Sequence, residues 1–169
     1  MKQGAVCTLM LVVAAAALAG CGPARRGVSP TPPKPVDLVD AIDLWVVPPA
    51  AINWDDVPGP DGVQVNVFLY RADRAEPVLG KGAVEFIMCE GRRPRENLES
   101  APPLKTWKFA EQELAALQMR GSAGWGYVAR LGWGRDVPQS AVVTLTARYL
   151  PLMGPPVSVR APIVIPIPK

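Results

Sequence analysis

Beyond residue 36, apolar and polar residues alternate along much of the chain. The clearest stripe takes every second position of one short segment: Val63, Val65, Val67 and Leu69. Because successive side chains of a strand point to opposite faces of a sheet, this spacing predicts a strand with one apolar face. The same period of two predicts strands over residues 42–46, 105–109, 125–133 and 141–149.

Two segments do not follow this simple alternation. Residues 83–89 are apolar on both faces apart from Glu85, which predicts a central strand covered on both sides. A buried Glu85 carboxylate would need a partner or a route to water. Residues 111–119, ended by Gly121, combine helix-forming residues and predict one short helical crossover between strands.

The last part of the chain has its own pattern. Along residues 157–168 the prolines Pro162, Pro166 and Pro168 take even positions, whereas six apolar residues take odd ones: Val157, Val159, Ala161, Ile163, Ile165 and Ile167. Since successive N–H groups of a strand point to opposite sides, this parity predicts an edge strand in a hairpin with residues 141–150. Six or seven strands and one helix predict an all-β domain over residues 37–169. We expect an antiparallel β-sandwich of immunoglobulin-like or transthyretin-like type.

The N-terminus has the pattern of a secretory signal. Lys2 precedes an apolar run over residues 6–18, which is too short to cross a bilayer as a helix. The run ends in four residues that resemble the lipobox of bacterial lipoproteins: Leu18-Ala19-Gly20-Cys21. The resemblance implies a signal peptide over residues 1–20 and a Cys21 that carries lipid on its sulfur and an acyl chain on its new amino group. Two or three acyl chains give lasting membrane anchorage.

Residues 21–36 predict a tether between this anchor and the domain. They are rich in proline and small residues, so they favour an extended polyproline conformation that spans about 45 Å. Gly22 stands where Asp would retain a lipoprotein at the inner membrane, so the resemblance implies a lipid-anchored protein of the bacterial envelope, with the outer membrane favoured. The chain carries 18 Lys and Arg against 15 Asp and Glu, and this balance indicates no nucleic-acid partner.

Catalytic and redox chemistry have little support in the sequence. The chain has no histidine, which removes the usual general base and the usual metal ligand. Cys7 leaves with the signal and Cys21 takes lipid, so Cys89 has no partner within the mature chain. We expect Cys89 to be a small buried apolar residue, and we expect no enzyme activity and no cofactor. An enzyme would require two convergent acids, such as Glu85 or the Asp55 and Asp56 pair.

One acidic segment is a candidate calcium site. Its oxygen ligands are Asn53, Asp55, Asp56 and Asp61. Oxygen atoms that converge from a loop suit calcium, but the spacing fails the EF-hand pattern because Val57 stands where a ligand is required. A solvated turn formed by the Pro and Gly residues of the same segment is the alternative. The basic residues 91–95 leave a similar choice between an anion site and a solvated long loop, since Glu90 and Glu96 lie beside them.

The five tryptophans allow a carbohydrate or peptidoglycan site, because exposed indoles stack against sugar rings. Trp45 and Trp54 lie near predicted loops and are the candidates for exposure. Trp107, Trp125 and Trp133 fall on the apolar parity of their strands, so we expect them to face the core.

Residues 58–70 carry a second resemblance. Their sequence, PGPDGVQVNVFLY, follows a lipobox, a tether and an acidic loop, and it is similar to the opening of the small outer-membrane lipoproteins of type VI secretion systems. That resemblance implies a transthyretin-like sandwich and, as an alternative function, an outer-membrane lipoprotein of such a secretion system. Taken together, the sequence predicts a membrane-tethered binding or scaffold module whose partner is another envelope protein or a cell-wall component.

Overall fold

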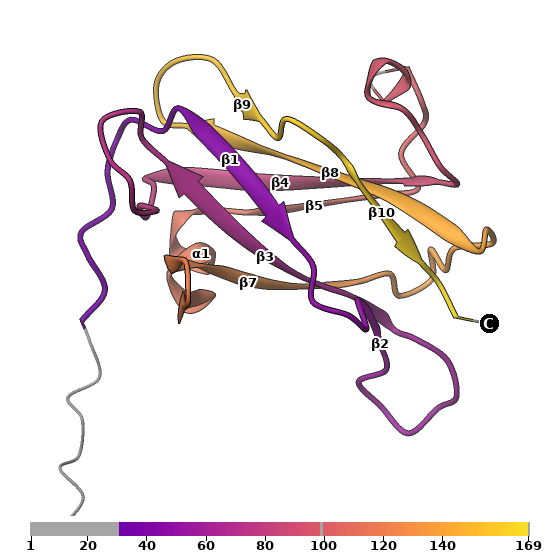
Figure 1. Ribbon diagram of the computed structural model, residues 1–169. Helices are drawn as coiled ribbons and strands as arrows, with labels where there is room; N and C mark the ends of the chain where they lie inside the picture. Colours follow the sequence, from indigo (N-terminus) through magenta and orange to yellow (C-terminus); the bar gives the residue numbers. More distant parts are fainter. Residues whose placement is uncertain (1–30, 99, 169) are drawn as a thin grey trace, which may run out of the picture. The chain divides into compact units, whose positions relative to one another are not determined.

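The computed structural model describes residues 31–98 and 100–168 (Figure 1). The proposed signal peptide and Cys21 lie outside these residues. In chain order the strands are β1 (Ala41–Trp45), β2 (Ala51–Ile52), β3 (Gly62–Tyr70), β4 (Gly82–Glu90), β5 (Lys105–Phe109), β6 (Gln118–Gly121), β7 (Gly124–Gly132), β8 (Val142–Pro151), β9 (Val157–Ser158) and β10 (Ile163–Pro166). A single turn of 3-10 helix, η1 (Arg95–Asn97), follows β4, and the helix α1 (Glu111–Ala116) follows β5.

These strands form two antiparallel sheets, so the predicted all-β sandwich is confirmed. Sheet I has the order β1-β3-β7-β6, with β2 also paired to β3. Sheet II has the order β10-β8-β4-β5, with β9 also paired to β8. The chain passes from sheet II to sheet I through α1, which is the predicted crossover. Within the described residues no helix is long and apolar enough to cross a membrane.

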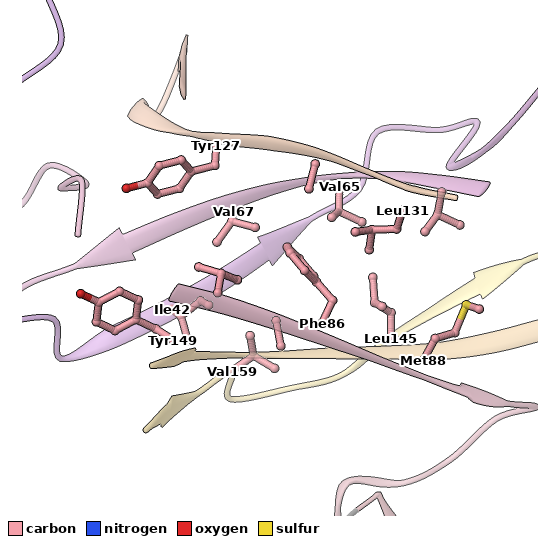
Figure 2. Packing of buried hydrophobic residues seen from close by; sticks show 14 of the residues in the cluster. Ile42, Val65, Val67, Phe86, Met88, Tyr127, Leu131, Leu145, Tyr149 and Val159 are labelled. Atoms are coloured by element: carbon pink, nitrogen blue, oxygen red, sulfur yellow. The ribbon is translucent and has the colours of Figure 1, made fainter. Parts of the chain in front are cut away.

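The core lies between the two sheets and is formed by the predicted apolar stripes (Figure 2). From sheet I, Val65 and Val67 of β3 face inward with Tyr127 and Leu131 of β7; all four are buried. From sheet II, the buried side chains come from β4 and β8: Val84, Phe86, Met88, Val143, Leu145 and Tyr149. The alternation in the sequence therefore reports the inner face of each sheet correctly.

The edge strand predicted from the proline parity is also confirmed, in two short pieces. The amides of Val159 and Ile167 donate to the carbonyls of Ala147 (3.0 Å) and Ala141 (2.8 Å). These donors occupy odd positions, whereas the prolines occupy even ones. The hairpin partner is β8, as predicted.

Two expectations need correction. Strand β4 is central, but it is not covered along its whole outer face: Glu85 and Ile87 are half-buried there because they face a surface groove. The helix ends at Ala116 rather than near residue 119, since Gln118 already pairs with Tyr127 as part of β6. Pairing with β7 overrides the helix propensity of this segment.

Candidate functional site

A groove lies on the outer face of sheet II. Its volume is about 540 Å³. The floor is formed by outward-facing side chains of three neighbouring strands: Glu85, Ile87, Thr106, Thr146 and Arg148. The wall is formed by the long loop after β4, through Arg95, Leu98, Ala101 and Pro103, and by Pro162. We call this site the sheet II groove.

Strand register sets the order of side chains on the floor. Glu85 of β4 lies opposite Arg148 of β8 on one side and Lys108 of β5 on the other. The Nε of Arg148 donates to Oε2 of Glu85, and only 14% of the Glu85 side chain is exposed. Arg148 is therefore the partner that a buried Glu85 carboxylate was expected to need. One row further along, Ile87 lies between Thr106 and Thr146, so an apolar side chain is flanked by two hydroxyls.

The wall of the groove is held by hydrogen bonds to the sheet. The buried Thr144 Oγ1 donates to the carbonyl of Gly91 (2.7 Å) and accepts from the amide of Arg93 (2.8 Å). Arg95 Nη1 donates to the carbonyl of Arg160 (2.5 Å), which fastens the loop to the segment between β9 and β10. Two arginines of the basic loop therefore bond to backbone carbonyls, since Arg93 Nε also donates to the Glu90 carbonyl (3.0 Å).

Cys89 lies beside Thr144 at the covered end of the same sheet face. The thiol is free and buried, as the sequence predicted. Burial raises the pKa of the Cys89 thiol, and the positive charge of Arg93 opposes that shift. A protonated, covered thiol is a packing group rather than a nucleophile.

The acidic segment forms the connection between β2 and β3. The Asp61 Oδ2 atom accepts from the amides of Trp54 (2.6 Å) and Asp55 (3.2 Å), and Asp55 Oδ1 accepts from the amide of Val57 (2.7 Å). Asn53 Oδ1 also accepts from the amide of Asp55 (2.9 Å). These oxygens organise the turn. Among the described residues no group of three acids, cysteines or histidines could hold a metal ion.

The two tryptophans proposed for carbohydrate binding have different environments. Trp45 is 46% exposed and rests against Phe68, with ring centroids 5.0 Å apart and planes tilted by 57°. Trp54 is half-buried, and the Arg130 guanidinium lies 6.0 Å from its ring centroid. A methyl group on Gly62 would come within 2.5 Å of the Trp54 ring, so the indole lies directly on the sheet. Of these two tryptophans, Trp45 is therefore exposed and Trp54 is not. Trp107, Trp125 and Trp133 pack against the core, as predicted.

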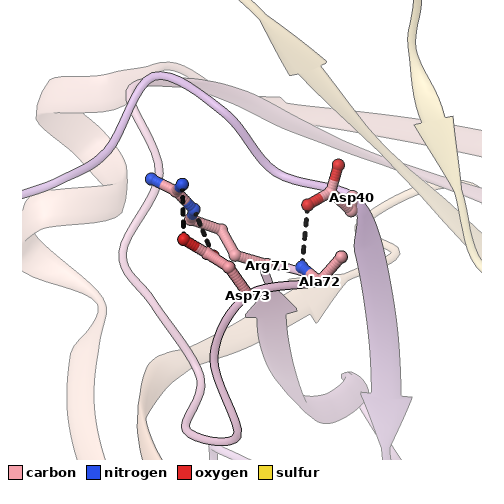
Figure 3. Close-up of polar contacts among 4 residues, drawn as sticks. All are labelled: Asp40, Arg71, Ala72 and Asp73. Atoms are coloured by element: carbon pink, nitrogen blue, oxygen red, sulfur yellow. Dashed lines mark hydrogen bonds and ion pairs between the residues drawn. The ribbon is translucent and has the colours of Figure 1, made fainter.

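A second polar cluster joins the beginning of β1 to the end of β3 (Figure 3). Asp40 Oδ2 accepts from the amide of Ala72 (2.8 Å), and the Arg71 guanidinium pairs with Asp73 (2.8 Å). Both contacts fix the turn that follows β3. We interpret them as structural, and no spacing pattern in the sequence pointed to Asp40.

The acids considered for catalysis do not share a cavity. Glu85 lies in the sheet II groove beside Arg148, whereas Asp55 and Asp56 lie in the turn that leads to β3 of sheet I. The groove residues Thr106 and Thr146 were visible in the sequence only as the polar parity of two predicted strands. No protein-family model, curated protein or solved structure matches the chain.

Proposed function

We propose that this protein is a lipid-anchored, non-enzymatic binding module of the bacterial envelope, with the outer membrane as its favoured location. In this proposal Cys21 holds the chain on the membrane, and the sheet II groove receives a segment of another envelope component. The observation that carries the binding function is the groove itself. Its volume of about 540 Å³ falls in the range of ligand sites, roughly 300–1,000 Å³.

The chemistry of the groove favours a peptide segment with both apolar and charged side chains. Ile87, Leu98 and Pro103 supply apolar contacts, and the hydroxyls of Thr106 and Thr146 can exchange hydrogen bonds with a backbone. The Glu85–Arg148 pair adds one charge of each sign on the floor. A bound segment that carries its own charges can pair with these groups without leaving either one unpartnered.

The anchor is tested first. Cells that express the full chain are grown with labelled palmitate, and the wild type is compared with Cys21→Ser. We expect label on the wild type and an unlabelled, uncleaved precursor for the variant. Normal trimming and labelling of Cys21→Ser would show that the anchor is elsewhere.

The groove is tested by photo-crosslinking in intact cells. A photoreactive residue is placed at Thr106, which is exposed on the groove floor, and at Arg120, an exposed position of β6 in the other sheet. We expect a discrete adduct from position 106 and none from position 120. Mass spectrometry of the adduct then separates a secretion-system component from a cell-wall protein. Equal adducts from both positions would contradict the assignment of the groove.

A further inference from the structure

The connection between β8 and β9 presents an exposed apolar tip. Leu152 is 69% exposed and Met153 is 89% exposed, which makes Met153 the most exposed large apolar side chain among the described residues. The sequence from residue 149 to residue 159, YLPLMGPPVSV, carries no charge. Soluble surfaces seldom leave adjacent large apolar side chains at a hairpin tip without a contact for them.

This tip lies at the end of the sandwich where the described chain begins. Pro151 pairs with Gly82 at the end of the β8–β4 ladder. Two residues earlier, Gly80 pairs with Val36, and the Val36 carbonyl accepts from the amide of Lys81 (2.8 Å). Figure 1 shows the connection between β8 and β9 and the first indigo segment at the same end of the sheets. Leu38, two residues past Val36, is also 56% exposed.

Chain length limits how far this end can be from the anchor. Ten peptide units join Cys21 to Thr31, and a fully extended chain spans at most about 3.6 Å per residue, or roughly 36 Å. The nine residues of β3 and the ten of β8 put the opposite end of the sandwich about 30 Å further along the strands. The Leu152-Met153 tip therefore lies at the end of the sandwich at which the tether joins it.

We propose that the Leu152-Met153 tip inserts into the surface of the same membrane that holds the lipid of Cys21. This inference rests on the proposed lipid anchor and adds a second contact to it. Pro151, Pro155 and Pro156 lack N–H donors, so the tip can enter an apolar layer with few unpaired donors. With the lipid and the tip both in contact, the sandwich stands on one end and holds the connection between β2 and β3 away from the bilayer.

The test uses the full lipidated protein, reconstituted into vesicles of phosphatidylethanolamine and phosphatidylglycerol. Met153→Cys and Val57→Cys are each labelled with an environment-sensitive fluorophore; Val57 is the matched control, since it is 64% exposed in the connection between β2 and β3. Cys89 is buried, which limits labelling there. We expect the label at position 153 to shift to shorter emission wavelength and to be quenched by nitroxide lipids. The label at position 57 should keep its aqueous emission.

Flotation of the vesicles separates the two hypotheses. A protein that does not float with vesicles lacks the lipid anchor, and both proposals fail. A protein that floats while its label at position 153 stays aqueous keeps the anchor and overturns the tip contact. Equal quenching at positions 153 and 57 would also overturn the inference, because the contact would then have no preferred end.

Discussion

Two tyrosines from opposite sheets hold the segment between β3 and β4, and removing either hydroxyl should lower stability measurably. The Tyr127 hydroxyl accepts from the amide of Gly80 (3.0 Å), and the Tyr149 hydroxyl donates to the carbonyl of Lys81. Both rings are buried, and Figure 2 shows their oxygens at the same end of the core. The perturbation is Tyr149→Phe, which keeps the ring and removes one donor.

The expected cost follows from the groups left without a partner. Phenylalanine at position 149 leaves the Lys81 carbonyl without its side-chain donor, and a buried polar group without a partner costs about 1–3 kcal/mol. Tyr127→Phe leaves the buried Gly80 amide without its acceptor, with a cost in the same range. Because both hydroxyls fix the same short segment, the double variant should lose less than the sum of the single losses.

Urea unfolding of a chain comprising residues 31–169 measures this loss. That chain should be soluble and give a sheet-dominated circular dichroism spectrum, which also tests the fold. With a urea dependence of about 1–3 kcal/mol per molar, a loss near 1.5 kcal/mol moves the midpoint by roughly 0.5–1.5 M. Tyr70→Phe is the matched control, since its ring is only half-buried on the outer face of sheet I. A Tyr149→Phe midpoint no lower than that of Tyr70→Phe would refute the reasoning.

The same pair predicts how stability changes in alkali. Burial, aided by the nearby Tyr127, Glu111 and Asp37, raises the pKa of Tyr149 to about 12 from its ordinary value of 10.0. The folded state therefore keeps the phenol proton more tightly than the unfolded state. This contribution is complete below pH 10 and is lost as the pH rises through about 12. Between these values the wild type should lose stability more steeply than Tyr149→Phe.

Two further sets of substitutions test the packing and the groove. A methyl group on Gly62 would lie 2.5 Å from the Leu131 carbonyl oxygen, so Gly62→Ala should lower the free energy of unfolding, measured by thermal unfolding, by about 1–3 kcal/mol. Gly121→Ala is the control: its methyl group first meets the terminal methyl of Met119, so the loss should be much smaller. Arg148→Glu places two carboxylates together and should lower the melting temperature. Adding Glu85→Arg reverses the ion pair and should restore the melting temperature. A double variant that does not recover would show that the pair does not act through its charges.

Much of the fold could be predicted because it depends on local parity. The apolar stripe of β3 and the proline parity of β9 and β10 both follow from the direction of successive groups along one strand. Each prediction needs only a few neighbouring residues, and each is confirmed by the burial and pairing in the structure. The predicted end of the helix was wrong, because the helix stops where Gln118 pairs with β7. Local helix propensity carries no information about that pairing.

The groove could not be predicted because it is made by contacts between distant segments. Thr144 binds the Gly91 carbonyl across 53 positions, and Arg95 binds the Arg160 carbonyl across 65. The residues that neighbour Thr144 and Arg95 in the sequence form no pattern that indicates either contact. Glu85 was the one useful signal, since a carboxylate in an apolar strand demanded a partner, and its partner Arg148 lies on the groove floor.

The edges of both sheets gain importance if the protein is held on a membrane, as we propose. Anchoring confines copies to a surface and raises their effective concentration, so an open edge would favour pairing between copies. Pro162 and Pro166 remove donors from the β9–β10 edge. At the other edge of sheet II, β5 carries the exposed Lys108, whose charge repels the same strand of a second copy. The β6 edge of sheet I is four residues long and includes Arg120. These three edges therefore oppose pairing between copies, which favours the sheet II groove over them as the surface that binds a partner.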